Sequence, residues 1–306
     1  MEPRRDGHNN VPASDPAGEG SRRQVLGFWL RVVGLAIVLA LLLKTLVVGF
    51  YRVPSASMER TILSGDFLVV DKVTYGARTP GRIPFTSLSI PSIRLPGLAR
   101  PRRGDIVVFR YPGAADAEGR SGESTFVKRC IGLPRDTVRI VNGSVLVNGV
   151  PLPVPPGCAP PMAAPRMAGA ADERLYPSGL GFNLDNYGPI VVPRKGDAVQ
   201  LSAATIKRWT SLLAGEGHTV SAGSGGEVLL DGIPTRSYSF TQDYFFVLGD
   251  NRANSLDSRF WGFLPEDHLI GKAFVVYWSR EGREGSSGFP ALLSTVRWGR
   301  IGTILR

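Results

Sequence analysis

The sequence is poor in cysteine and histidine. Among its 306 residues there are two Cys and three His. Two cysteines cannot supply the dense disulfide framework of small secreted domains. The sequence leaves open whether Cys130 and Cys158 form one bridge or remain two free thiols. His8 lies in a polar tail, His218 in a Gly-flanked loop and His268 beside two acidic residues, so each is interpreted as a surface or structural residue.

Several motifs of catalysis and nucleic-acid binding are also absent. There is no H-E-x-x-H pair and no G-x-S-x-G turn, which argues against a zinc protease and an α/β-hydrolase. There is no zinc-finger spacing and no RNP-like aromatic motif, so we expect no nucleic-acid partner despite the net charge of +10. A surface that faces anionic lipid headgroups accounts equally well for this charge.

The chain has one long apolar segment, from Val25 to Phe50, interrupted by Arg31 and Lys44. Its uninterrupted part, residues 32–43, is 12 residues long, which is typical of a signal-peptide core. If Arg31 snorkels, the segment from Val25 provides about 19 apolar residues, enough for one transmembrane helix. The segment alone does not distinguish a cleavable signal from an anchor. Basic residues on both sides leave its orientation open as well.

Beyond Met58 the sequence favours β-structure. The 24 Pro and 37 Gly suit strands and turns better than long helices. Ser202–Ala214 is the best candidate for a soluble helix, with Ser202 as its N-cap. Asn142-Gly143 predicts a tight hairpin turn. The predicted strands are residues 66–73, 104–111, 126–133, 137–141, 144–147, 244–248 and 272–278.

Three polar strings follow the apolar segment. The first is Pro54-Ser55-Ala56-Ser57-Met58-Glu59-Arg60-Thr61-Ile62-Leu63, the second is Gly104-Asp105-Ile106-Val107-Val108-Phe109 leading to Val127-Lys128-Arg129-Cys130-Ile131-Gly132-Leu133-Pro134, and the third is Gly249-Asp250-Asn251-Arg252-Ala253-Asn254-Ser255-Leu256-Asp257-Ser258-Arg259-Phe260-Trp261-Gly262. Taken alone, the turn Pro54–Met58 is either a site that is cut or a site that cuts. Lys128-Arg129 alone would be a solvated basic pair, and Asp257 with Arg259 an exposed pair worth under about 1 kcal/mol.

Together and in this order, the three strings resemble the conserved boxes of bacterial type I signal peptidases, also called leader peptidases. The resemblance covers about residues 30–80, 101–141 and 240–280, and the ending Val296–Gly302 is also similar. It implies that Pro54–Met58 is a nucleophile turn and that the apolar segment is retained as an anchor. Self-cleavage near this turn is the lesser alternative. Glu59-Arg60 and Ala253 depart from the family pattern, and we expect altered local support there rather than lost activity.

The resemblance also assigns roles to residues. It makes Ser57 the nucleophile and Lys128 the general base of a Ser–Lys dyad. Ser55 contributes its hydroxyl to the oxyanion hole, together with the backbone N–H of Ser57. Ser255 is expected to hydrogen-bond and orient Lys128. The remaining supports of the site are Asp257 and Arg259.

A lysine can act as a base near neutral pH only if its pKa is depressed. The reference value of about 10.4 would keep the amine protonated. Burial against apolar neighbours disfavours the charged form and lowers the pKa. A strand would place Phe126, Lys128 and Cys130 on one face, which provides such neighbours.

The resemblance implies a mainly β fold with one N-terminal transmembrane helix and a signal-peptidase-like catalytic region that carries an inserted, smaller α+β domain. We expect a disordered tail at 1–21, an anchor helix at 22–50, a catalytic core at 51–141 and 241–306, and the inserted domain at 142–240. The string Phe182–Pro189 within that insertion resembles inserts of some members, but the sequence assigns it no role.

The implied activity is removal of signal peptides from exported preproteins after small residues, as in A-x-A. The expected partners are membrane-bound preproteins and anionic headgroups, with a monomeric enzyme, no metal and no organic cofactor. The implied location is the plasma membrane, with a single span and an extracytoplasmic catalytic domain. Two alternatives remain: a Ser–Lys protease with one exported substrate, and a catalytically silent peptide- or lipid-binding relative.

Overall fold

The computed structural model describes residues 17–79, 91, 93–113, 124–158, 164–281 and 294–305. The chain divides into two units, residues 1–44 and 45–306. In the first unit, helix α1 (Ala17–Leu42) contains a 19-residue segment, Gln24–Leu42, with a mean hydropathy of 2.5. By length and composition this segment can cross a membrane, as expected for an anchor.

The boundaries predicted for the tail and the anchor need correction. Residues 1–16 of the predicted tail lie outside the described residues, and α1 already begins at Ala17 rather than at 22. At its other end, the helix continues as one π-helical turn (η1, Leu43–Val47) and does not extend to residue 50. Instead, Val48–Arg52 forms strand β1, because this β-branched and aromatic segment pairs with β2 (Asp66–Asp71).

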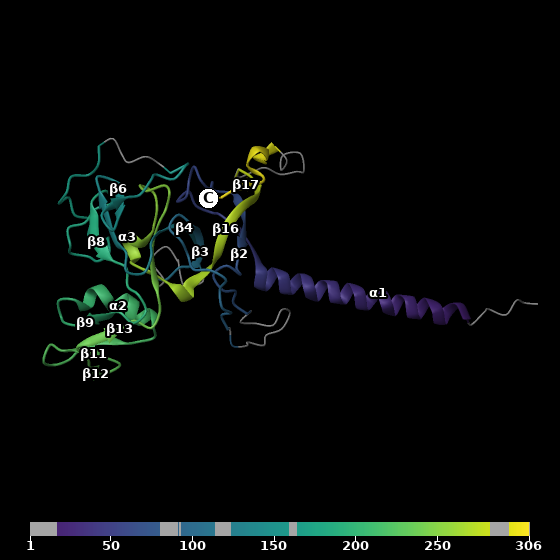
Figure 1. Cartoon of the computed structure of the whole chain (residues 1–306), viewed down its shortest axis with the longest axis horizontal. Coiled ribbons are helices and arrows are strands. Elements are labelled where there is room, and N and C mark those ends of the chain that lie inside the picture. The colour runs from purple at the N-terminus through teal and green to yellow at the C-terminus, as the bar shows by residue number, and fades with distance from the viewer. Residues whose placement is uncertain are drawn as a thin grey trace, which may run out of the picture. The chain divides into compact units, whose positions relative to one another are not determined.

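The second unit is built on an antiparallel sheet of eight strands (Figure 1). Its order is β1-β2-β16-β3-β4-β14-β15, and β17 also pairs with β16. The other strands of this sheet are β3 (Ile106–Arg110), β4 (Thr125–Gly132), β14 (Tyr244–Leu248), β15 (Leu264–Pro265), β16 (Leu269–Ser279) and β17 (Thr303–Ile304). The mainly β fold expected from the sequence is therefore confirmed.

This sheet is covered on both faces around its centre. Along β3, Ile106 and Val108 belong to one hydrophobic cluster, whereas Val107 and Phe109 belong to another. Because successive side chains of a strand point to opposite faces, the two clusters lie on the two sides of the sheet. A continuous apolar run is what such a doubly covered strand requires.

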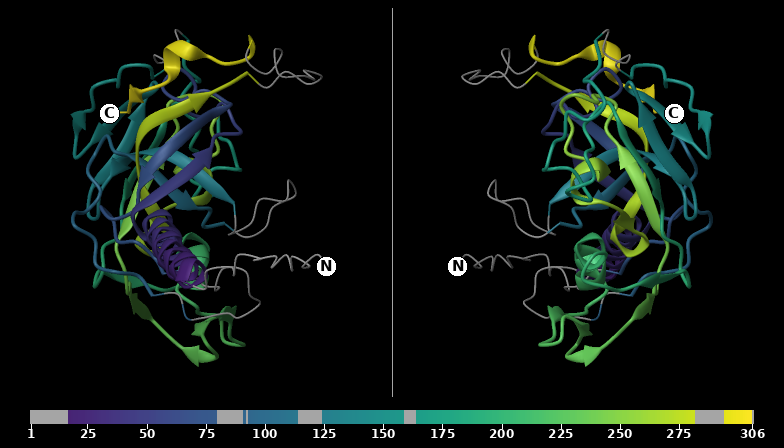
Figure 2. Two further views of the ribbon diagram at one scale, coloured as in Figure 1. Left: turned by 90° about the vertical axis from the view of Figure 1, so that its right-hand side faces the viewer. Right: turned by 90° about the vertical axis from the view of Figure 1, so that its left-hand side faces the viewer.

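Three smaller sheets follow β4 in the chain. One has the order β7-β6-β5-β8, one has the order β10-β11-β12, and one pairs β13 with β9. Their strands are β5 (Thr137–Val141), β6 (Ser144–Val147), β7 (Val150–Pro151), β8 (Tyr187–Val191), β9 (Ala198–Gln200), β10 (Val220–Ala222), β11 (Val228–Leu230), β12 (Ile233–Pro234) and β13 (Ser237–Ser239). Figure 2 shows the region of β11 and β12, drawn in green, projecting from one end of the unit.

The domain boundary predicted after residue 141 divides a paired hairpin. β5 pairs with β6 through the turn Asn142-Gly143, whose φ angles of 48° and 79° suit this sequence. The core around these strands also includes Ile131 of β4 and Phe246 of β14. The smaller sheets therefore share a hydrophobic core with the main sheet, and all of residues 45–306 form one compact unit.

The soluble helices are short. Helix α2 (Ile206–Gly215) begins later than predicted: its N-cap is Thr205 rather than Ser202, because residues 203–205 form a turn before it. Helix α3 (Ser258–Trp261) begins at an N-cap formed by Asp257, and two short 3-10 turns are η2 (Glu266–His268) and η3 (Trp298–Arg300). Cys130 and Cys158 are both buried and free, so they do not form a disulfide.

Candidate active site

Ser57 lies in the turn that follows β1. The next residue, Met58, is fully buried together with Ile62 in the cluster on one face of the main sheet. Backbone hydrogen bonds close the turn, from Glu59 N to Ala56 O (3.0 Å) and from Ile62 N to Met58 O (2.8 Å). Burial of Met58 thus anchors the turn and leaves the half-buried Ser57 beside it at the surface of a cavity.

Lys128 lies in β4, between β3 and β14, and only 3% of it is exposed. Its Nζ is 2.6 Å from Ser57 Oγ and donates a hydrogen bond to Val127 O at 3.1 Å. It also lies 5.2 Å from the centre of the Phe126 ring. Burial lowers the pKa of Lys128 to about 8, although the charges of Asp257 and Asp250 oppose the shift. About a tenth of an amine with this pKa is unprotonated at pH 7 and about half at pH 8, and this form can accept a proton from the serine hydroxyl.

The serine and the lysine open onto a cavity of about 580 Å³. Tyr51 of β1, Phe126 of β4, Val53 just after β1 and Leu256 of the third string are among the residues that line it. This volume falls in the range that is usual for ligand-binding clefts. The pair is therefore accessible to a substrate although the lysine is buried.

Ser55 lies next to the proposed nucleophile. Its Oγ is 3.3 Å from Ser57 Oγ, and its side chain is exposed. Among the residues that the structure describes, none accepts a hydrogen bond from the backbone N–H of Ser57. The hydroxyl of Ser55 and this N–H are both donors that a developing oxyanion could use.

Ser255 is buried, and its Oγ makes no hydrogen bond of good geometry within the described part of the chain, although it lies near enough to the Asp257 carboxylate to help lower that carboxyl's pKa. The expected hydrogen bond to Lys128 is not formed in this structure, in which Lys128 Nζ contacts Ser57 Oγ and Val127 O. Gly249 packs directly against this serine. A Cβ built on Gly249 would lie 2.2 Å from Ser255 Oγ and 2.5 Å from Ser57 O, so a larger residue does not fit.

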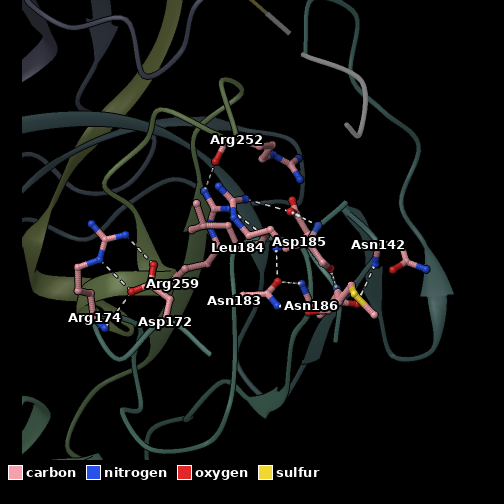
Figure 3. Close-up of polar contacts among 11 residues, drawn as sticks. Asn142, Asp172, Arg174, Asn183, Leu184, Asp185, Asn186, Arg252 and Arg259 are labelled. Carbon is pink, nitrogen blue, oxygen red and sulfur yellow. Dashed lines mark hydrogen bonds and ion pairs between the residues drawn. The ribbon is translucent and has the colours of Figure 1, made fainter. Parts of the chain in front are cut away.

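Asp257 and Arg259 form a buried ion pair rather than an exposed one. The guanidinium donates to both carboxylate oxygens at 2.9 Å, and Asp257 also accepts from Gly249 N at 3.1 Å. Burial opposes ionisation of Asp257, but the charge and hydrogen bonds of Arg259 outweigh it and lower the carboxyl pKa. Arg259 also donates to Arg252 O and Leu184 O, which ties the third string to the string Phe182–Pro189 (Figure 3).

A second buried ion pair was not expected from the sequence. Arg129 donates to both oxygens of Asp250, at 2.8 and 2.7 Å, and the two side chains are 2% and 0% exposed. Asp250 also accepts from Thr61 Oγ1 at 2.6 Å. The pair therefore joins all three strings. No local signal in the sequence could have found this pair, because its two residues are 121 positions apart.

Asn251 completes this connection. Its backbone N–H donates to Ser57 O at 3.1 Å, and its side-chain amide donates to Ala56 O at 3.2 Å. The loop after β14 therefore holds the backbone of the serine turn directly.

Among the described residues, no group of three or more His, Cys, Asp or Glu side chains is placed to hold a metal ion.

Fold and site define a mainly β protein with a serine–lysine pair of the kind that serine hydrolases use. A family model described as "Signal peptidase, peptidase S26" matches residues 26–278. The chain therefore belongs to the signal peptidase family, peptidase S26, and is a serine endopeptidase.

Individual relatives agree with this assignment. The signal peptidase I of Aquifex aeolicus is 31% identical over 80% of this chain and 81% of its own length. The signal peptidase I of Leptolyngbya laminosa is 28% identical over 87% of both chains. That of Pseudomonas aeruginosa is 27% identical over 79% of this chain and 69% of its own length.

Proposed function

We propose that this protein is a membrane-anchored endopeptidase that removes signal peptides from exported preproteins, with Ser57 as nucleophile and Lys128 as general base. The observation that carries the proposal is the 2.6 Å distance between Ser57 Oγ and the Nζ of a buried lysine. Family membership supports the substrate class, since the relatives are named signal peptidase I.

The reaction proceeds by acyl transfer. Unprotonated Lys128 takes the proton of the Ser57 hydroxyl while Oγ attacks the scissile carbonyl carbon. Ser55 Oγ and the Ser57 N–H donate to the developing oxyanion, and each such donor contributes about 3 kcal/mol. The Lys128 ammonium then protonates the departing amine, which leaves an ester on Ser57. Lys128 next takes a proton from water while the resulting hydroxide attacks the ester carbonyl. When this tetrahedral intermediate collapses, the Lys128 ammonium returns the proton to Ser57 Oγ, and the signal peptide departs as a carboxylic acid that ionises in water.

Three supports keep this geometry. Asp257 and Arg259 hold the loop after β14, and the same loop contacts the serine turn through Asn251. Ser255 lies in that loop with a hydroxyl that makes no hydrogen bond of good geometry within the described residues, so we assign it the role of orienting Lys128 when the lysine has released Ser57. The roles of Ser55, Ser255, Asp257 and Arg259 are all part of the proposal.

The cleavage preference is for small residues at the first and third positions before the cut, as in A-x-A. The apolar walls contributed by Tyr51, Val53 and Phe126 support this preference. The apolar segment Gln24–Leu42 anchors the enzyme at the plasma membrane by a single span and raises the effective concentration of membrane-bound substrates. The catalytic unit lies on the extracytoplasmic side, the enzyme is monomeric, and its basic surface contacts anionic headgroups.

The direct test uses cleavage of a preprotein with an A-x-A site by the full chain in lipid. Ser57→Ala and Lys128→Ala should each lower kcat by about 1,000-fold or more. Ser237→Ala and Lys207→Ala change exposed residues of the same types and should retain wild-type rates. Full activity of either site variant would refute the Ser–Lys mechanism. A wild-type enzyme inert on every preprotein would favour a single dedicated substrate or a silent relative.

A further inference from the structure

A second cavity, of about 700 Å³, adjoins the loop formed by residues 249–257. Asn251, Arg252 and Ala253 contribute to its wall, whereas Asn254 and Leu256 contribute to the wall of the Ser57 cavity. β4 is shared in the same way, because Lys128 lines the smaller cavity and Arg129 the larger one. The larger cavity is therefore distinct from the proposed active site but uses the same loop and strand.

Most of the wall is apolar. Ile106 and Ile131 of the main sheet and Val145 of β6 line it. The proline-rich segment Pro151–Pro156 lines it as well, and Leu152 in this segment packs against the hydrophobic core. A wall of this kind suits an aliphatic ligand, because burial of each CH₂ group contributes about 0.8 kcal/mol.

The charges of the wall are balanced with one exception. Every charged wall residue other than Arg252 forms an ion pair; the pairs are Arg103–Asp136, Lys272–Asp105, Arg129–Asp250, Arg166–Asp185 and Arg259–Asp257. Within the described ranges, the Arg252 guanidinium has no carboxylate partner: its Nε donates to Gly249 O at 3.0 Å, and it also lies beside the thiol of Cys158, another residue of the wall. Figure 3 shows Arg252 with Asp185, and no ion pair joins them. The cavity thus has one uncompensated positive charge.

Arg252 is also held in place on its backbone side. Its carbonyl oxygen accepts a hydrogen bond from Arg259 at 2.7 Å. Burial lowers the pKa of Arg252, which is the expected response of a cation that lacks a counterion. A guanidinium is adapted to bidentate hydrogen bonding with a carboxylate, and no ion pair of Arg252 with a carboxylate is formed among the described residues.

We propose that the cavity binds a small aliphatic carboxylate, with the carboxylate on Arg252 and the alkyl chain against Leu152 and Ile131. The ligand would contact the loop whose Asn251 holds the serine turn. The binding claim itself rests on the cavity and its charge, not on the proposed peptidase activity.

The test is calorimetric titration of octanoate into the full chain in zwitterionic nanodiscs, with empty nanodiscs as the blank. Arg252→Gln should weaken binding by about 10- to 100-fold, the usual loss for a charged hydrogen bond. Arg103→Gln removes another wall arginine, but one already paired with Asp136, and should leave the affinity within a factor of about 3. 1-Octanol, which lacks the charge, should bind about as weakly to wild type as octanoate binds to Arg252→Gln.

A second variant tests the apolar half. Leu152→Trp narrows the part of the cavity that would hold the alkyl chain and should weaken octanoate binding while Arg252 remains, provided that thermal unfolding shows a folded protein. Comparison of octanoate with a short apolar peptide, free or amidated at its C-terminus, distinguishes a fatty acid from a peptide carboxylate as the source of the ligand. Absence of octanoate heat above the blank, or equal affinity of wild type and Arg252→Gln, would overturn the proposal.

Discussion

Arg129 and Asp250 form a fully buried ion pair that is joined by two hydrogen bonds. Arg129 directly follows the proposed base, Lys128, in β4. Adjacent residues of a strand point to opposite sides, so the arginine contacts the loop after β14 while the lysine contacts Ser57. The arginine has a carboxylate partner, whereas the lysine has none at hydrogen-bond distance among the residues that the structure describes. This difference allows one of two neighbouring cations to lose its proton near neutral pH.

The depressed pKa of Lys128 predicts the pH dependence of the enzyme. Because the base must be unprotonated, kcat/KM should rise with pH along a single limb centred near the lysine pKa of about 8. Initial rates on a preprotein between pH 6 and 10 measure it. A limb near the ordinary histidine pKa of about 6.5 would contradict the assignment.

The same pKa predicts that burial of Lys128 lowers the free energy of unfolding. Its folded pKa of about 8 is below the unfolded value of 10.5, so the unfolded chain binds more protons between these values and stability rises with pH across that window. Below pH 8 the cost is full and amounts to about 3 kcal/mol. Lys128→Met should therefore unfold at a higher temperature than wild type at pH 7, and the gain should shrink by pH 10. A gain independent of pH would show that packing, not charge, is responsible.

Disruption of the Arg129–Asp250 pair should destabilise the protein strongly. Arg129→Met leaves Asp250 buried without its main partner, and the expected cost is about 3–5 kcal/mol. Arg129→Met combined with Asp250→Leu should recover much of this loss, because no buried charge remains. Denaturant unfolding measures both. A single variant as stable as wild type would show that the pair is not desolvated.

Gly249 should tolerate no side chain. In Gly249→Ala, the new Cβ would lie within 2.5 Å of Ser57 O, so the loop or the serine turn must move and kcat should fall by about 100-fold. Gly215→Ala at the end of α2 is the matched control, since its Cβ meets nothing within 4 Å. Its rate should equal that of wild type. Normal kcat in Gly249→Ala would mean that the turn adjusts freely.

Substitution of Ser255 can distinguish a structural role of its hydroxyl from a role in orienting Lys128. Because its Oγ makes no hydrogen bond of good geometry in the described residues, Ser255→Ala should change the unfolding free energy by less than about 0.5 kcal/mol. If the hydroxyl orients Lys128 during turnover, kcat should still fall by about 10-fold or more with KM unchanged. Loss of stability without loss of kcat would refute the orienting role.

Much of the fold could be predicted from local patterns. Strands β5, β6 and β14 have the predicted boundaries, because short apolar runs between turn residues fix where a strand begins and ends. The ends of the anchor helix and of α2 were wrong by several residues. In both cases the neighbouring structure determines where the helix ends or begins. Val48–Arg52 pairs with β2 and is therefore a strand, and a turn at the start of α2 places its N-cap at Thr205.

The sequence by itself determined the mainly β class, the anchor segment and the residue types of a Ser–Lys site, since these depend on composition, periodicity and short strings. Only the tertiary structure decided which charges are neutralised. Arg129, Asp257 and Arg259 read as exposed in the sequence, yet they are buried because their partners lie on other strands or on the same tight loop. A pairing between β4 and a loop 121 residues away has no local signature. The distance of 2.6 Å between Ser57 Oγ and Lys128 Nζ likewise results from packing of Met58 against the sheet. This packing cannot be deduced from the sequence motif alone.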